Sequence, residues 1–150
     1  MPRITPFHLF KKIIAADNLK TNAIQLEIAI PFGYIPRGLA TDATGVAFES
    51  KQYLLSSELL KHVKAAYFET DLQELSDGAV DVELYDYDAG SVIAKVSLSA
   101  TTKRSRVDVD TSKLVSGHAL GVRFNVTTAG ASGSTGGGCS PVLILVLGVS

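Results

Sequence analysis

Apolar residues recur at every second position along most of this chain from residue 22 onward, and this alternation constrains the fold more than any other feature. Successive side chains of a β-strand point to opposite faces of a sheet, so a period of two predicts strands with one buried face. The clearest case is residues 80–98, where two alternating segments flank the turn residues Asp88, Ala89 and Gly90. We therefore expect a β-hairpin there.

Similar extended patterns cover residues 24–30, 46–55, 65–75, 107–109 and 120–126. Residues 56–63 have helical spacing instead, with Ser56 or Ser57 placed to cap a short connecting helix. Strands do not alternate with long helices, which argues against a parallel sheet. The sequence predicts an all-β protein, an antiparallel sandwich of jelly-roll type with about eight or nine strands.

The length of 150 residues fits one sandwich domain, which we place at residues 21–150 behind an N-terminal arm or first strand at residues 1–20. The start lacks a signal-peptide cleavage pattern, so we expect synthesis in the cytoplasm without an export signal. The longest apolar run, residues 141–149, is about half the length of a membrane helix, so no membrane span is expected.

Charge and cysteine content exclude several partners. The net charge of -1 offers no basic field for nucleic acid. Cys139 is the only cysteine, so an internal disulfide and a cysteine-based zinc site are excluded, while an intermolecular disulfide stays open.

The last predicted strand breaks the alternation, because residues 142–147 are apolar without exception. In a two-layer sandwich one face of each sheet normally meets water. If Val142, Ile144 and Val146 face the core, then a second set points outward and needs a covering partner. We predict that this set forms an oligomer interface: Leu143, Leu145 and Leu147.

The N-terminal arm carries a second apolar set around Lys11 and Lys12, which we assign to the same interface: Phe7, Phe10, Ile13 and Ile14. The arm is suited to lie over its own sandwich or over that of a neighbouring copy. The sequence does not decide between the two.

The glycine-rich stretch 127–140 lacks the Gly-Lys-Ser/Thr sequence of a phosphate-binding loop and precedes a strand rather than a helix. We expect it to be a loop outside the packed core.

No set of residues predicts catalysis. His8, His62 and His118 lie in different predicted elements, and no serine occupies a nucleophile elbow. Candidates for paired carboxylates are acidic residues on strands: Glu69, Asp71, Glu83 and Asp86. Alternating acids on an exposed sheet face are expected for solubility alone.

No cofactor is expected, although a structural calcium ion is an alternative at the aspartates near two turns, Asp86 and Asp88 together with Asp77 or Asp81. Aspartates in turns usually accept hydrogen bonds from nearby backbone, and we favour that interpretation.

Tyr85 and Tyr87 share one side of a predicted strand, opposite its apolar residues. They could form a glycan-binding face, since aromatic rings stack on sugars, or pack against neighbouring strands.

Our leading hypothesis is a non-enzymatic structural protein that assembles with copies of itself through its termini. By fold-level analogy we expect a virion subunit (capsid, decoration or surface protein), located in a virion or extracellular assembly. Its partners would be other copies of itself and, as an alternative, other shell or surface proteins. The main rival is a carbohydrate-binding β-sandwich module that uses Tyr85 and Tyr87. A third hypothesis is an enzyme without a linear motif.

Overall fold

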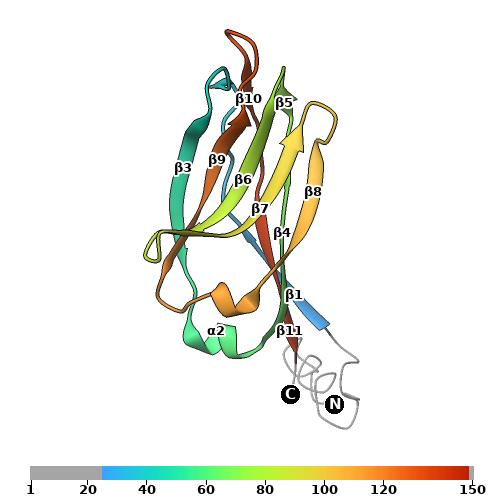
Figure 1. Ribbon diagram of the computed structural model, residues 1–150. Coiled ribbons are helices and arrows are strands. Elements are labelled where there is room, and N and C mark those ends of the chain that lie inside the picture. Colours follow the sequence, from blue (N-terminus) through green and yellow to red (C-terminus); the bar gives the residue numbers. More distant parts are fainter. Residues whose placement is uncertain (1–24, 149–150) are drawn as a thin grey trace, which may run out of the picture.

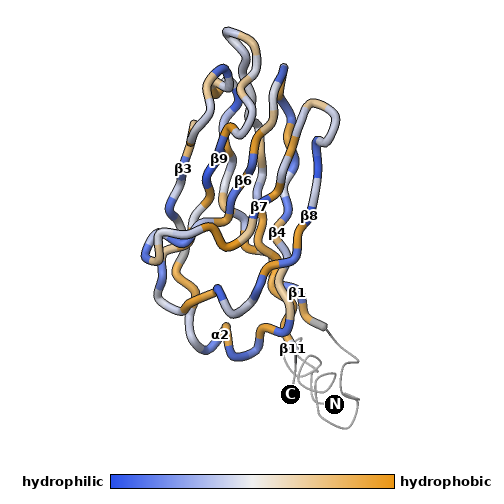
Figure 2. Tube along the Cα trace, viewed as in Figure 1, coloured by the Kyte–Doolittle hydropathy of each residue, from blue (hydrophilic) through white to orange (hydrophobic). Residues whose placement is uncertain are grey.

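The computed structural model describes residues 25–148 and shows two four-stranded antiparallel sheets packed face to face, with a smaller third sheet at one end (Figure 1). The predicted all-β antiparallel sandwich is confirmed. Along strands such as β6 and β9, hydrophobic and hydrophilic residues follow one another closely (Figure 2), as expected for sheets with one buried face.

The first sheet has the strand order β1-β11-β4-β8. Its strands are β1 (Gln25–Pro31), β4 (Val63–Asp71), β8 (Arg104–Val109) and β11 (Val142–Gly148). All neighbouring strands are antiparallel, and β11 lies inside the sheet between β1 and β4.

The second sheet has the order β3-β9-β6-β7. Its strands are β3 (Gly45–Leu54), β6 (Ala79–Asp86), β7 (Ser91–Ser99) and β9 (Ala119–Thr128). If these eight long strands are counted in chain order, the sheets read 1-8-3-6 and 2-7-4-5. This is the jelly-roll arrangement, in which the chain crosses repeatedly between the two sheets. The predicted hairpin of residues 80–98 is the β6–β7 pair.

The glycine-rich stretch does not stay outside the packed structure, so that prediction is wrong. Within it, β10 (Thr135–Gly137) pairs on both sides with two short strands, β2 (Leu39–Ala40) and β5 (Glu74–Leu75). Gly137 has a φ of 125°, and a Cβ there would collide with the carbonyl oxygen of Pro36. Glycine is required here because the backbones approach closely and because φ is positive.

Two short helical turns connect strands. The helix α2 (Ser57–Lys61) begins at its N-cap Ser56, whose Oγ accepts a hydrogen bond from the N–H of Leu59, as the sequence predicts. The 3-10 turn η2 (Thr111–Lys113) begins in the same way at Asp110.

The core lies between the two sheets, and β11 contributes to it with the residues that we expected on the outside. Leu143 and Leu145 are fully buried in the core cluster, and Leu147 packs against it. Leu143 lies opposite Phe68 in the pairing of β11 with β4, which places it on the inward side. The predicted outward position of Leu143, Leu145 and Leu147 is therefore wrong.

Candidate functional site

The outward side of β11 is apolar as well, and it lies at the centre of a surface that we call the apolar face. Strand pairing arranges this surface in three rows, each running across the sheet. The rows are Pro31–Val142–Glu69–Arg106, Ala29–Ile144–Tyr67–Asp108 and Glu27–Val146–Ala65. Each row places an apolar residue of β11 in the middle and carries a charged side chain at an end.

Ile144 and Val146 have exposed fractions of only 8% and 4%, yet neither belongs to the core cluster between the sheets. Ala29 on the edge strand β1 is exposed, and Tyr67 on β4 is half-buried. The surface is thus a shallow apolar strip on a sheet face that in a sandwich normally meets water.

One side of the apolar face is bounded by an ion pair. Arg106 Nε lies 2.8 Å from Glu69 Oε2, and the guanidinium lies 5.2 Å from the centre of the Tyr67 ring. The Glu69 hydrogen bond and charge raise the pKa of Arg106, and the charge of Glu27 adds to this. Since 49% of the Arg106 side chain and 25% of the Glu69 side chain are exposed, solvent screens this pair.

A groove of about 370 Å³ opens at one end of the apolar face, between β4 and the end of β8. Its lining includes Ala65, Tyr67, Asp108 and Asp110, together with Lys64. Asp110 caps η2 through Ser112, while Asp108 makes no ion pair within the described chain. An apolar floor with carboxylates at the rim suits an aromatic side chain that is followed by a cation.

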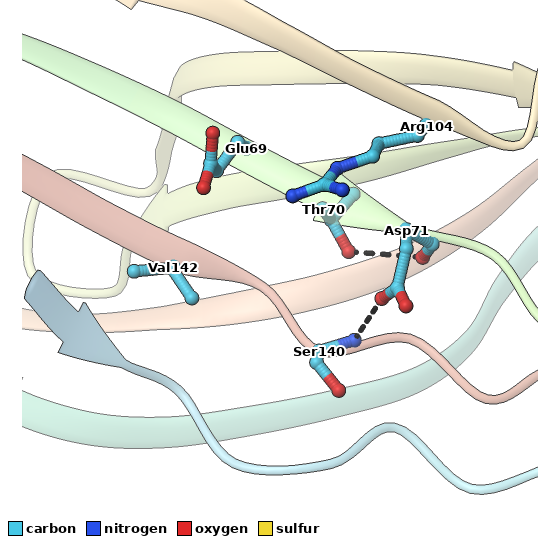
Figure 3. Close-up of a pocket in the computed structure, with 6 residues that line it drawn as sticks. All are labelled: Glu69, Thr70, Asp71, Arg104, Ser140 and Val142. Atoms are coloured by element: carbon cyan, nitrogen blue, oxygen red, sulfur yellow. Dashed lines mark hydrogen bonds between the residues drawn. The ribbon is translucent and has the colours of Figure 1, made fainter.

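A smaller pocket of about 220 Å³ lies at the opposite end of the face, next to Val142 (Figure 3). The Arg104 side chain extends into the region between Glu69 and Asp71. Asp71 accepts a hydrogen bond from the N–H of Ser140, at 3.0 Å. This pocket brings the predicted carboxylate candidates Glu69 and Asp71 together, but its volume is below that of typical small-molecule sites.

The outer side of the other sheet differs from the apolar face, and we call it the ionic face. Glu83 Oε2 accepts a hydrogen bond from Arg123 Nε at 2.9 Å, and its Oε1 accepts one from Asn125. Asp81 accepts hydrogen bonds from Lys95 and Ser97. The Arg123 and Glu83 side chains have exposed fractions of 20% and 6%, so the Glu83 carboxylate is largely shielded from solvent.

Tyr85 and Tyr87 lie at the end of the ionic face, on one side as predicted, and their rings meet edge to face with centres 5.1 Å apart. The Arg123 guanidinium lies 4.1 Å from the centre of the Tyr85 ring. The Tyr87 ring packs over Gly121, where a Cβ would come within 2.6 Å of it. Burial raises the pKa of Tyr87, and the charge of Glu49 adds to this. A sugar ring would have to displace these contacts, so the geometry does not favour a glycan-binding face.

Asp86 is buried at the end of β6, where its Oδ1 accepts hydrogen bonds from the N–H groups of Asp88 and Ala89. Its Oδ2 lies 2.8 Å from His118 Nδ1. Burial alone would raise the pKa of Asp86, but the hydrogen bond from Ala89 and the contact with His118 together lower it below its ordinary value. These bonds tie the β6–β7 turn to the start of β9.

The other aspartates of the alternative calcium site have separate roles. Asp77 lies beyond the opposite end of β6 and accepts hydrogen bonds from the N–H groups of Gly78 and Ala131. Asp88 accepts one from the N–H of Ala119. Within residues 25–148, no group of three or more His, Cys, Asp or Glu side chains could hold a metal ion.

Cys139 is fully buried next to Ile35, with which its backbone pairs. Burial, aided by the nearby charge of Asp71, raises the pKa of its thiol to about 12. The thiol is therefore protonated at neutral pH and inaccessible in the folded chain.

Four of the seven residues of the predicted oligomer interface lie outside the described residues: Phe7, Phe10, Ile13 and Ile14. The other three, the leucines of β11, face the core. The outward positions of Ile144 and Val146 were not predicted, although the doubly apolar pattern of residues 142–147 indicated that one set had to point outward.

No family model and no curated protein matches the chain. Among solved structures it is similar to the infectious bursal disease virus VP2 subviral particle, with a TM-score of 0.43 and 10% identity over 85% of this chain and 33% of that one. A second match is a Bacillus endospore appendage from a family of disulfide-linked pili, with a TM-score of 0.39 and 15% identity over 89% of this chain and 94% of that one.

The chain thus spans about a third of the VP2 chain that it resembles. At these TM-scores neither likeness supports an argument about function. No helix within the described residues is long and apolar enough to cross a membrane.

Proposed function

We propose that this chain is a non-enzymatic structural subunit that assembles with copies of itself, and that the apolar face contributes to the contact between copies. The observation that carries this proposal is the position of Ile144 and Val146, two large apolar side chains at the centre of an outward-facing sheet surface. Ile144 and Val146 retain little exposed area themselves, so the apolar area that a partner would remove from water, at about 25 cal/mol per Å², belongs mainly to residues around them such as Ala29 and Tyr67.

The contrast with the ionic face supports the same proposal. There, the carboxylates of Asp81 and Glu83 already accept hydrogen bonds from side chains of the same chain, so they need no donors from a partner. The acids that could suggest catalysis are likewise engaged in hydrogen bonds that hold strands and turns together: Glu69, Asp71, Glu83 and Asp86.

A finer form of the proposal is a virion subunit, which includes a capsid, decoration or surface protein. The jelly-roll strand order supports it by fold-level analogy alone.

The native mass of the full chain tests the proposal. Light scattering should give a mass several times the 15.9 kDa of one chain, and electron microscopy should show closed shells or fibres. A species of 15.9 kDa across the accessible concentration range would contradict it.

A further inference from the structure

The groove between β4 and β8 lies at one end of the apolar face. It has the Tyr67 ring in its wall and the carboxylates of Asp108 and Asp110 at its rim. We infer that the N-terminal segment of a neighbouring copy lies across the apolar face, with Phe10 in the groove between β4 and β8. This inference rests on the proposed function, because it names the contact through which the copies assemble.

Charge is the first argument. Residues 1–24 contain four basic side chains and one acidic side chain, whereas residues 25–150 contain ten basic and fourteen acidic ones. The segment and the rest of the chain thus carry opposite net charges, +3 and −4. Opposite charges favour the encounter of the two surfaces and set their register.

The order of residues in the segment matches the groove. Phe10 is followed directly by Lys11 and Lys12. The groove offers Ala65 and Tyr67 to the aromatic ring, and the carboxylates of Asp108 and Asp110 to the ammonium groups. Lys64, also in the lining, is the one base that opposes them. A buried aromatic anchor with charges at the rim is the usual composition of a strong interface contact.

Chain length permits the contact. Ten residues, 15–24, separate Ile14 from β1, and an extended chain of that length spans up to about 33 Å. β1 is the edge strand of the sheet that carries the apolar face, and its first residue, Gln25, lies opposite Gly148 at the end of that sheet. The segment is thus joined to an edge strand at the border of the apolar face, and copies that assemble through this face, as proposed, would bring their N-terminal segments close to one another's grooves.

Disulfide trapping between two variants, each with one introduced cysteine, tests the inference on the full chain. One variant carries Leu9→Cys, which keeps Phe10, and the other carries Ala65→Cys in the groove and a size tag. The native Cys139 is buried and should not react. Mild oxidation of the mixture should link the two differently sized chains. Val46→Cys is the matched control, because Val46 is 45% exposed on the outer side of β3, in the other sheet.

Adding Phe10→Ser to the Leu9→Cys chain should abolish the linked species, whereas Phe10→Leu should retain it, since a large apolar side chain still fills the groove. Equal linking to Ala65→Cys and Val46→Cys would overturn the inference. So would a Leu9→Cys/Ala65→Cys double variant that forms the disulfide only within one chain.

The native mass separates failure of the inference from failure of the proposed function. Large assemblies that show no linking of Leu9→Cys to Ala65→Cys would leave the proposed function in place and overturn the inference. A 15.9 kDa species without any link between chains would overturn both.

Discussion

The two outer sheet faces of this protein contain the same three-residue arrangement in two different settings. On each face an arginine pairs across strands with a glutamate and lies over a tyrosine two residues along the glutamate's strand. On the ionic face, Glu83 is almost completely covered and has Asn125 as a further partner. On the apolar face, Glu69 and Arg106 remain far more exposed and border the strip of Ile144 and Val146.

The comparison teaches that the surroundings decide what such an ion pair does. Removing one member of a pair covered by its neighbours is costly, because the remaining charge stays buried without compensation. A pair exposed to solvent contributes little to folding and stays available to guide a partner. The ionic face therefore shields its ion pair within one chain, whereas the apolar face leaves the pair of Arg106 and Glu69 accessible to solvent.

The largest expected effect on stability comes from breaking the covered ion pair between Arg123 and Glu83. Arg123→Leu leaves Glu83 buried with Asn125 as its remaining hydrogen-bond partner, and we expect the free energy of unfolding to fall by about 3 kcal/mol. Arg106→Leu, the matched change on the apolar face, should leave stability nearly unchanged. Denaturant unfolding of both variants measures the difference.

Glu83→Gln in the Arg123→Leu background is the control, because it removes the uncompensated charge and keeps the shape of the side chain. It should restore part of the lost stability. Equal losses for Arg123→Leu and Arg106→Leu would show that the two faces do not differ in the way proposed.

The alternating strands were predictable from the sequence because one buried face imposes a period of two. The orientation of β11 was not, since a strand without alternation gives no preference for either face. Only the pairing of Leu143 with Phe68 and Ile30 fixes it.

The same limit applies to the contacts of Tyr85, although not to the side of the sheet on which it lies. Its position on the outer side followed from the alternation along β6. The guanidinium of Arg123 over its ring depends on the register between β6 and β9, which no local pattern contains. The packing of Gly137 against Pro36 is a tertiary contact of the same kind, and composition alone suggested a loop.

Gly121 tests how tightly the ionic face is packed. A Cβ at this position would collide with the Ser50 carbonyl oxygen and press on the Tyr87 ring. Gly121→Ala should therefore lower the free energy of unfolding by about 2 kcal/mol through overpacking. Thermal unfolding measures it, with Ala94→Gly on β7 as a control for the effect of glycine in a strand. An unchanged melting temperature in Gly121→Ala would mean that the β3–β9 contact is looser than described.

Acid should weaken the end of the ionic sheet through Asp86. Its pKa in the folded chain is below the ordinary value of 3.8, so its stabilising contribution is present above that pH and is lost as the pH falls through the lower folded-state value. Asp86→Asn should cost about 1 kcal/mol at neutral pH, a modest amount because His118 is partly exposed and solvent screens the pair. The stability difference between wild type and Asp86→Asn should vanish in acid. A stability difference that persists in acid would show that Asp86→Asn acts through the shape of the side chain and not through the loss of its charge.

The smallest effect on stability should come from Ala29, and it separates folding from assembly. Ala29 is exposed on β1, in the row of Ile144 and Tyr67, so Ala29→Glu should change the free energy of unfolding by less than about 0.5 kcal/mol. The added carboxylate would nevertheless lie against the apolar strip and lose hydration if a partner covered it. We therefore expect a folded chain with reduced native mass. Val46→Glu, an equally exposed change on the opposite sheet, should leave the native mass as in the wild type. Loss of assembly in Val46→Glu but not in Ala29→Glu would indicate that the copies contact one another through the ionic face and not through the apolar face.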